Sequence, residues 1–285
     1  MALSRDKRVL LTLNAHSWME PNNEACLQTI AEALCRESVS VAALQEVNQS
    51  ADAPVAAAEL LAQSHYVCAG DCPIREDNFA LQLALRLARQ GTPYHWTWAY
   101  AHRGYRVYEE GVAVFTSLPI LRTDSACVSR MLAEDTPHYC RRQVLGVLAG
   151  SAEAARWYYS VHMGWWNDPL DPFGEQWARL QARCANQPTY LLGDFNCPAH
   201  IPGEGYAQIT KGTFWQDCYQ RAQQKDGGIT VGGQIDGWRK EPVHGMRIDY
   251  ILTNRDGLTA SSRVIFNNSF YPVVSDHFGV LVQEE

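Results

Sequence analysis

The chain has 285 residues, of which 46% are hydrophobic and 19% are charged, and 24 lysines and arginines against 31 aspartates and glutamates give a net charge of −7. This composition supplies enough apolar surface for a packed core and excludes a disordered chain, while 20 glycines and 13 prolines exclude a collagen-like or linker-rich one. The negative charge argues against nucleic acid as a partner, because neutralisation of phosphates by lysine and arginine dominates such binding. It allows a small phosphorylated substrate, which needs only a few local cations or a metal.

Apolar runs and helix signals alternate through the first hundred residues. The expected elements are a strand at Val9–Asn14, a helix capped by Asn22 or Asn23 that ends near Arg36, an apolar strand at Val39–Val47, a helix at Asp77–Arg89 and an aromatic strand at Tyr94–Tyr100. The leucine spacing in Asp77–Arg89 alone suits a strand, but the length, the alanine content and a cap at Asp77 favour a buried helix.

Short strands dominate the rest of the chain, with one further predicted helix at Phe173–Ala185. The predicted strands are Gly111–Thr116, Val144–Ala149, Trp157–His162, Tyr190–Asn196, Ile248–Thr253, Val264–Phe266 and Phe278–Val282. About nine or more strands with a few helices predict an α/β fold in which two sheets pack face to face and helices flank them. Turn signals are spread evenly, so we expect residues 1–285 to form a single domain.

Membrane and export signals are weak in this chain. No stretch approaches the ~18 apolar residues that a membrane-spanning helix needs, and the apolar run Val9–Leu13 is shorter than the ~7–15-residue core of a signal peptide. We therefore expect a cytoplasmic protein with no membrane partner. The nine cysteines are scattered, with Cys68 and Cys72 as the closest pair, which predicts reduced and mostly buried thiols.

Polar side chains end or interrupt the predicted apolar strands. These residues are Asn14, Glu46, His162, Asp194, Asn196, Asp249, Asp276 and His277. A charge beside an apolar strand has to be paired, hydrogen-bonded or metal-bound, because unpaired burial costs several kcal/mol. Any one of them can be a turn-forming residue. Their recurrence at the ends of separate strands predicts one shared site, since ligands of α/β sheets bind at strand ends.

The residue types suit one kind of chemistry. Three of them offer hard oxygen ligands, which suit Mg²⁺ or Mn²⁺ rather than zinc; these are Glu46, Asp276 and Asn14. Asp194 with Asn196 can orient and deprotonate a water. Either His277 or His162 can stabilise charge on a phosphoryl group or protonate the leaving oxygen.

The same residues lie in motifs that resemble the metal-dependent endonuclease/exonuclease/phosphatase superfamily. The motifs are Leu13-Asn14, Leu44-Gln45-Glu46-Val47, Glu110-Gly111-Val112-Ala113-Val114, Ser160-Val161-His162, Gly193-Asp194-Phe195-Asn196, Arg247-Ile248-Asp249-Tyr250 and Ser275-Asp276-His277. They follow the order of the superfamily and span nearly the whole chain. Each motif alone is weak, but the ordered set is specific.

The resemblance implies a four-layer α/β sandwich of the DNase I-like type, with the site at one end of the paired sheets. It implies that Glu46 is the main metal ligand, helped by Asn14 and Asp276. Whether one or two metal ions bind is left open.

The resemblance also implies roles in catalysis. Asp194 would activate or position the attacking water, and Asn196 would bind the phosphate. Asp249 would orient His277, which would face the scissile phosphate.

His162 matches a histidine of the DNase I-like branch. That branch pairs this histidine with a glutamate, and Glu110 is the matching residue here. The apurinic-site endonuclease branch has a tyrosine at the position, so His162 argues against that branch.

A narrower resemblance, to the bacterial maltose 6′-phosphate phosphatases, indicates the substrate. The segments that carry it are Thr12–Trp18, Asp77–Leu81, Tyr94–Trp98, Tyr108–Gly111, Val161–Asn167, Gly203–Tyr206, Asp226–Thr230, Ile235–Trp238 and Arg263–Gly279. Several fall between the core motifs, in predicted loops, where specificity usually lies. In that family, phosphate is removed from a phosphorylated disaccharide that a sugar phosphotransferase system has imported.

Aromatic and basic residues near the motifs are candidates for substrate binding. Trp165 and Trp166 follow His162 closely and suit a sugar, although only one of the two faces the site if the strand continues. Arg247 adjoins the Arg-Ile-Asp-Tyr motif and is the first candidate for holding phosphate. The other candidates are Arg103, Arg106, Arg141 and Arg142.

Three functions remain as alternatives at this point. The first is a metal-dependent monoesterase that acts on a small phosphorylated sugar. The second is a phosphodiesterase or nuclease on the same scaffold, which the catalytic residues alone do not separate from the first; the lack of a lysine- and arginine-rich stripe counts against it. The third is a binding module with a degenerate site, which the complete residue set disfavours. The sequence leaves the oligomeric state open.

Overall fold

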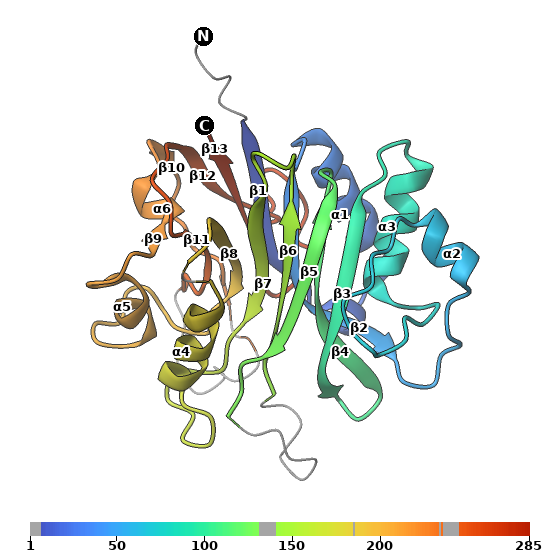
Figure 1. The fold of residues 1–285 in the computed structure, drawn as a ribbon, viewed down its shortest axis with the longest axis horizontal. Helices are drawn as coiled ribbons and strands as arrows, with labels where there is room; N and C mark the ends of the chain where they lie inside the picture. The colour runs from blue at the N-terminus through green and yellow to red at the C-terminus, as the bar shows by residue number, and fades with distance from the viewer. Residues whose placement is uncertain (1–6, 131–140, 185, 234, 236–244) are drawn as a thin grey trace.

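Two β-sheets pack face to face in the computed structural model, which describes residues 7–130, 141–184, 186–233, 235 and 245–285 (Figure 1). The seven-stranded sheet has the order β10 (Gln224–Lys225), β12 (Thr259–Ile265), β13 (Gly279–Glu284), β1 (Arg8–Asn14), β2 (Val41–Ser50), β4 (Tyr108–Thr116) and β3 (His95–Gly104). The six-stranded sheet has the order β5 (Ile120–Cys127), β6 (Gln143–Ala149), β7 (Arg156–His162), β8 (Thr189–Asp194), β11 (Asp249–Thr253) and β9 (Gln216–Asp217).

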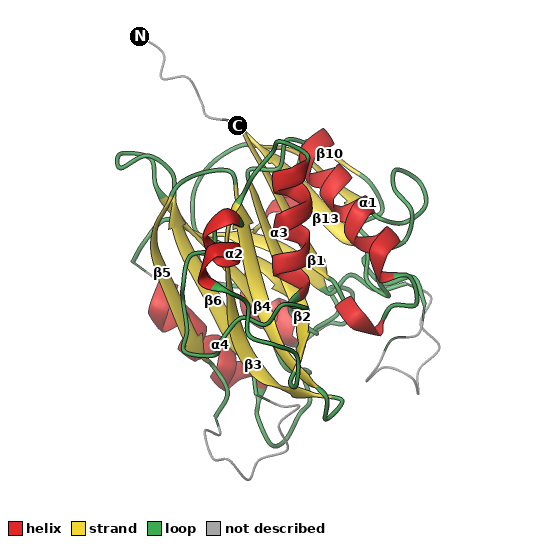
Figure 2. Cartoon of the chain, turned by 90° about the vertical axis from the view of Figure 1, so that its right-hand side faces the viewer, coloured by secondary structure: helices red, strands yellow, loops and turns green. Residues whose placement is uncertain are grey.

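Helices cover the outer faces of both sheets. The seven-stranded sheet packs against α1 (Asn23–Arg36) and α3 (Phe79–Arg89), with α2 (Ala58–Gln63) beside them (Figure 2). The six-stranded sheet packs against α4 (Phe173–Cys184) and α5 (Gly205–Thr210). The short helices η1 (Ser17–Met19) and α6 (Cys218–Arg221) complete the described helices. The predicted four-layer sandwich is confirmed.

The alternation of apolar residues explains the layers. In β1, Leu11 and Leu13 pack toward α1 and α3, whereas Leu10 faces the other sheet. Between the sheets, residues of β2 and β4 meet Leu145 of β6 and Leu192 of β8. Strands buried on both faces read as continuous apolar runs, which is why the sequence pattern identified them.

Two helix starts differ from the expected caps. The cap of helix α3 lies one residue later than predicted, at Asn78, whose side chain accepts from the backbone N–H groups of Ala80 and Leu81. Asp77 instead accepts from the backbone N–H of Ser50. Helix α1 does begin at Asn23, but the side chain of Asn22 makes no capping bond.

Several elements were not predicted from the sequence. They are α2, β5, α5, β9, α6 and β10. Strand β5 alternates poorly and is half-exposed along its length, and β9 and β10 have two residues each. Such elements carry little hydrophobic periodicity of their own.

The cysteines are free throughout the described residues. Four are buried, three are half-buried and Cys68 is exposed, so the expectation of mostly buried thiols holds for half of these eight. Among the described helices, none combines the length and the apolar character that crossing a bilayer requires.

Candidate active site

The ends of five strands bring the predicted polar residues together. Strands β1 and β2 are parallel neighbours in one sheet, and β7 and β8 are parallel neighbours in the other. In the second sheet His162 lies opposite Asp194, and Asp194 lies opposite Asp249 of β11. Because parallel strands end at the same edge, these side chains share one end of the sandwich.

Glu46 lies on an irregularity in β2. The register with β4 shifts between Leu44 and Val47, and Glu46 has a φ of 51°. The hydroxyl of Ser17 donates to the Glu46 carbonyl at 2.7 Å and accepts from the Asn48 N–H at 3.0 Å, which holds this bulge. The preceding residue, Gln45, donates to Ser160 of β7 at 3.0 Å and so ties the sheets together. The bulge thereby leaves the Glu46 side chain at the site, 22% exposed.

Asn14 joins the two sheets at the centre of the site. Its fully buried amide nitrogen donates to Glu46 Oε1 at 2.9 Å and to Asp194 Oδ2 at 3.2 Å. Its amide oxygen accepts from the backbone N–H of His16 at 3.2 Å, and its backbone carbonyl accepts from the Ser275 hydroxyl at 2.7 Å. Asn14 therefore fixes the spacing of the two carboxylates.

Asp194 is a buried carboxylate with several donors around it. Its Oδ1 accepts from the Asn196 N–H at 2.8 Å, and its Oδ2 lies 3.7 Å from His162 Nε2 and 3.9 Å from His277 Nε2. Burial raises the pKa of Asp194 to about 7, and the charge of Asp249 acts in the same direction. A carboxylate with a pKa near neutrality is suited to accept a proton from water.

Asn196 is held rigidly next to it. Its backbone has a φ of 49°, and its side-chain nitrogen donates to the Met163 carbonyl at 2.9 Å.

Asp249 orients His277. The ring Nδ1 of His277 lies 3.1 Å from Asp249 Oδ2, and both side chains are buried. Burial by itself lowers the pKa of His277, but the charge of Asp249 and its hydrogen bond outweigh burial and raise that pKa to about 10. The ring is therefore an imidazolium at neutral pH, with Nε2 on the side of Asp194. Ligand atoms of Asp194, Asp249 and His277 all lie within 4.8 Å of one another.

His162 and Glu110 have different partners from those expected. Arg142 Nη1 lies 2.9 Å from His162 Nε2, and Glu110 Oε1 lies 3.3 Å from His102 Nε2. Burial and the neighbouring charge of Arg142 hold the pKa of His162 well below its usual value. The structure thus pairs His162 with Arg142 and Glu110 with His102, instead of His162 with Glu110.

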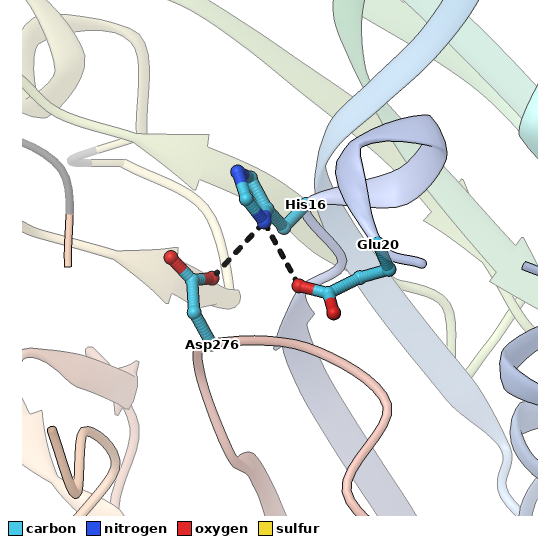
Figure 3. Close-up of side chains that lie close together, drawn as sticks. All are labelled: His16, Glu20 and Asp276. Atoms are coloured by element: carbon cyan, nitrogen blue, oxygen red, sulfur yellow. Dashed lines mark hydrogen bonds and ion pairs between the residues drawn. The ribbon is translucent and has the colours of Figure 1, made fainter. Parts of the chain in front are cut away.

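Asp276 belongs to a group that the sequence analysis did not single out. His16 Nδ1 lies 2.9 Å from Glu20 Oε1 and 3.7 Å from Asp276 Oδ1 (Figure 3). Burial lowers the pKa of His16, but the charges of Asp276 and Glu46 raise it above its usual value overall. The sequence signals for His16 are its position two residues after Asn14 and its place in the Thr12–Trp18 segment, whereas Glu20 had none.

The predicted substrate-binding residues lie differently. Arg247 is buried and pairs with Asp217 at 2.7 Å, and its guanidinium lies 4.6–5.0 Å from the ring centres of three tyrosines, Tyr206, Tyr219 and Tyr250. It is engaged within the fold, so its assignment to phosphate is not supported. Trp165 and Trp166 are both half-buried, and Trp166 packs edge-on against Phe173 at the margin of the core.

The donor set fits a divalent cation. Glu46 and Asp276 are partly exposed, at 22% and 27% of their side chains. In the part of the chain that the structure describes, no lysine or arginine forms an ion pair with either. Asn14 links the two residues, because its side chain donates to Glu46 and its carbonyl accepts from Ser275, whose hydroxyl also donates to Asp276 Oδ1. Unneutralised carboxylates at an opening are the ligands that Mg²⁺ or Mn²⁺ takes.

Comparisons with known proteins agree with this geometry. The profile of the Endonuclease/Exonuclease/phosphatase family matches residues 11–277. A search of curated proteins found no match.

Solved structures share the fold over almost the full length. An endonuclease/exonuclease/phosphatase family protein from Leptotrichia buccalis is 30% identical, with a TM-score of 0.82 over 98% of this chain and 99% of that one. A mannosyl-6-phosphatase from Bacteroides thetaiotaomicron is 14% identical, with a TM-score of 0.64 over 98% and 99%. A humanized D. rerio TDP2 is 12% identical, with a TM-score of 0.58 over 98% and 99%.

Proposed function

Because the chain belongs to the endonuclease/exonuclease/phosphatase family of hydrolases, we propose that it is a metal-dependent phosphomonoesterase that releases phosphate from a phosphorylated disaccharide such as maltose 6′-phosphate. The observation that carries the proposal is the convergence of Asp194, the Asp249–His277 pair and the carboxylates of Glu46 and Asp276 at one end of the sandwich.

The side chains divide the reaction between them. Asp194 takes a proton from the attacking water as the new P–O bond forms, and the Asn196 N–H keeps its carboxylate oriented. The His277 imidazolium, held by Asp249, donates to a phosphoryl oxygen and stabilises the charge that develops there. The P–O bond to the sugar breaks, the leaving oxygen takes up a proton from solvent, and Asp194 returns its own proton to solvent.

Glu46 and Asp276 would hold the divalent ion, and Asn14 would set the position of Glu46. When bound, the ion supplies Lewis-acid stabilisation of phosphoryl charge.

A sugar phosphate is favoured over nucleic acid on two grounds. The net charge of −7 opposes a polyanionic substrate, whose binding depends on many cations. The second ground is that a structural relative, 14% identical to this chain, carries the name mannosyl-6-phosphatase. We extend the proposal to a cytoplasmic role, where imported phosphorylated sugars occur.

The test is a phosphate-release screen over phosphorylated mono- and disaccharides with Mg²⁺, with Mn²⁺ and with EDTA, run in parallel with nicking of plasmid DNA. We expect metal-dependent release from maltose 6′-phosphate that far exceeds cleavage of DNA. The variant Asp194→Ala should be inactive, and the exposed-site control Asp256→Ala should keep wild-type turnover. DNA nicking equal to or faster than sugar-phosphate hydrolysis at the same enzyme concentration would refute the proposal.

A further inference from the structure

A second polar cluster lies beside the proposed metal ligands, between the ends of β3, β4 and β7. A small pocket there is lined by His102, Glu110, Arg142 and His162, among other residues. Arg142 is only 6% exposed. A guanidinium buried to this extent is normally matched by a carboxylate in fork geometry.

Arg142 lacks such a match in the described part of the chain. Its Nη1 is directed to the ring nitrogen of His162, at 2.9 Å, and its backbone N–H donates to Ser129. Its buried Nε has no hydrogen-bond partner among the described residues. The His162 ring carries no negative charge, so this contact orients the guanidinium without neutralising its charge.

The acidic neighbour of the cluster contributes little compensation. Glu110 is buried and lies against His102. Its carboxylate forms no ion pair with Arg142 among the described residues, and the charge of Arg142 acts on it only at longer range. The positive charge of Arg142 therefore remains available to an anion.

Asn48, in the seven-stranded sheet beside Glu110, is a second residue with unsatisfied polar atoms. It is fully buried, and both polar atoms of its side chain lack partners within the described residues. It lies directly opposite Glu110 in the β2–β4 ladder, so the two side chains stand on the same face, and it follows Glu46 by two residues. An unpaired buried amide is costly, which indicates that it serves a ligand.

We propose that Arg142 and Asn48 form a phosphoryl-oxygen subsite on the His162 side of the centre, and that this subsite selects a phosphomonoester dianion over a diester. The inference rests on the proposed hydrolase function and specifies its substrate class. A monoester presents three terminal oxygens and about two negative charges, whereas a diester presents two oxygens and one charge. A guanidinium with an unpaired N–H, together with an amide donor from the facing sheet, gains most from the additional oxygen and charge.

The test compares Arg142→Gln, Arg142→Lys and Asn48→Leu with wild type and with Arg89→Gln, a control that removes one exposed positive charge at the end of α3. The probes are p-nitrophenyl phosphate, bis-p-nitrophenyl phosphate and inorganic phosphate, whose binding is measured by calorimetry. We expect each of the three variants to lose about 10- to 100-fold in kcat/KM on the monoester and in phosphate affinity, with a much smaller loss on the diester. Affinity for Mg²⁺ and the properties of Arg89→Gln should not change.

Asn48→Leu keeps the test decisive if the arginine variants fold poorly. It removes two unpaired polar atoms from the interior at similar volume, so we expect the melting temperature to stay the same or rise while phosphate affinity falls. Unchanged phosphate affinity in Asn48→Leu and in the folded Arg142 variants, or equal losses on monoester and diester, would overturn the subsite. If the wild type preferred the diester, the proposed function would be overturned. If phosphate binding still depended on Arg142 in that case, the anion subsite itself would stand.

Discussion

The glycine of the Gly-Asp-Phe-Asn segment offers a direct test of how the two catalytic strands are held. Gly193 of β8 lies opposite Val161 of β7, and the next pair along these strands is Asp194 opposite His162. A Cβ added at Gly193 would lie 1.8 Å from the Val161 carbonyl oxygen, where a real contact needs at least 3.0 Å. In Gly193→Ala the strands must therefore separate by about 1.2 Å, since both groups are backbone or fixed to it.

Separation of β7 and β8 would also move the catalytic side chains at the ends of these strands. Asp194 Oδ2 and His162 Nε2 are 3.7 Å apart in the native protein. A misplacement of about 1 Å is enough to reduce turnover by roughly 10²-fold, and overpacking a well-packed core costs about 1–3 kcal/mol of stability. We expect Gly193→Ala to show both losses.

The assay is steady-state release of phosphate from the best sugar phosphate, with urea denaturation of the same preparations. The matched control is Gly227→Ala, where an added Cβ meets nothing within 4 Å and φ is not positive. If Gly193→Ala kept kcat within twofold of wild type, close packing of β7 on β8 would not be what positions Asp194.

Three further outcomes follow from the geometry. Glu46→Gln should weaken Mg²⁺ binding in calorimetry by tenfold or more, with little change in the urea midpoint. The substitution removes a charge at constant volume, and the amide oxygen can still accept from Asn14. Unchanged Mg²⁺ affinity would remove Glu46 from the ligand set. Asp249→Asn should lower the pKa of His277 from about 10 toward or below 6.5, as followed by NMR of the metal-free protein. Since the folded pKa is raised, the stability from this pair is fully present below about pH 6.5 and is lost as pH rises through about 10, so the stability gap between wild type and variant should close at alkaline pH; a gap that widened there would contradict the sign. Asn78→Ala should destabilise the protein by about 1 kcal/mol in urea, because two N–H groups at the start of α3 lose their acceptor; an unchanged midpoint would show that the cap contributes nothing.

The site was predictable where an abrupt change from apolar to polar residues marks a strand end. Asp194 and His162 are examples, because a carboxylate or imidazole that follows a buried strand has few alternatives to a ligand or a partner. The strand order that brings Asp249 opposite Asp194 depends on long-range pairing, which no local pattern encodes.

The failures have a common physical origin. Arg247 adjoins a catalytic motif in sequence, but the fold pairs its guanidinium with Asp217 and places it over three tyrosine rings. Arg142 was one of several equivalent arginines until the structure showed its burial and its contact with His162. Adjacency along the chain is thus a poor guide to which cation meets the substrate.

Because of the bulge in β2, the number of residues in that strand decides whether Glu46 reaches the site. In a regular strand Gln45 would face the opposite sheet, and Glu46 would point into the hydrophobic core beneath α1 and α3. Because of the extra residue, Gln45 can link the two sheets while Glu46 lies at the site. Val47 then packs again toward α1 and α3. Deleting one residue of the bulge would restore regular alternation along β2 and take the Glu46 carboxylate away from Asn14, so this strand tolerates substitution more readily than a change of length.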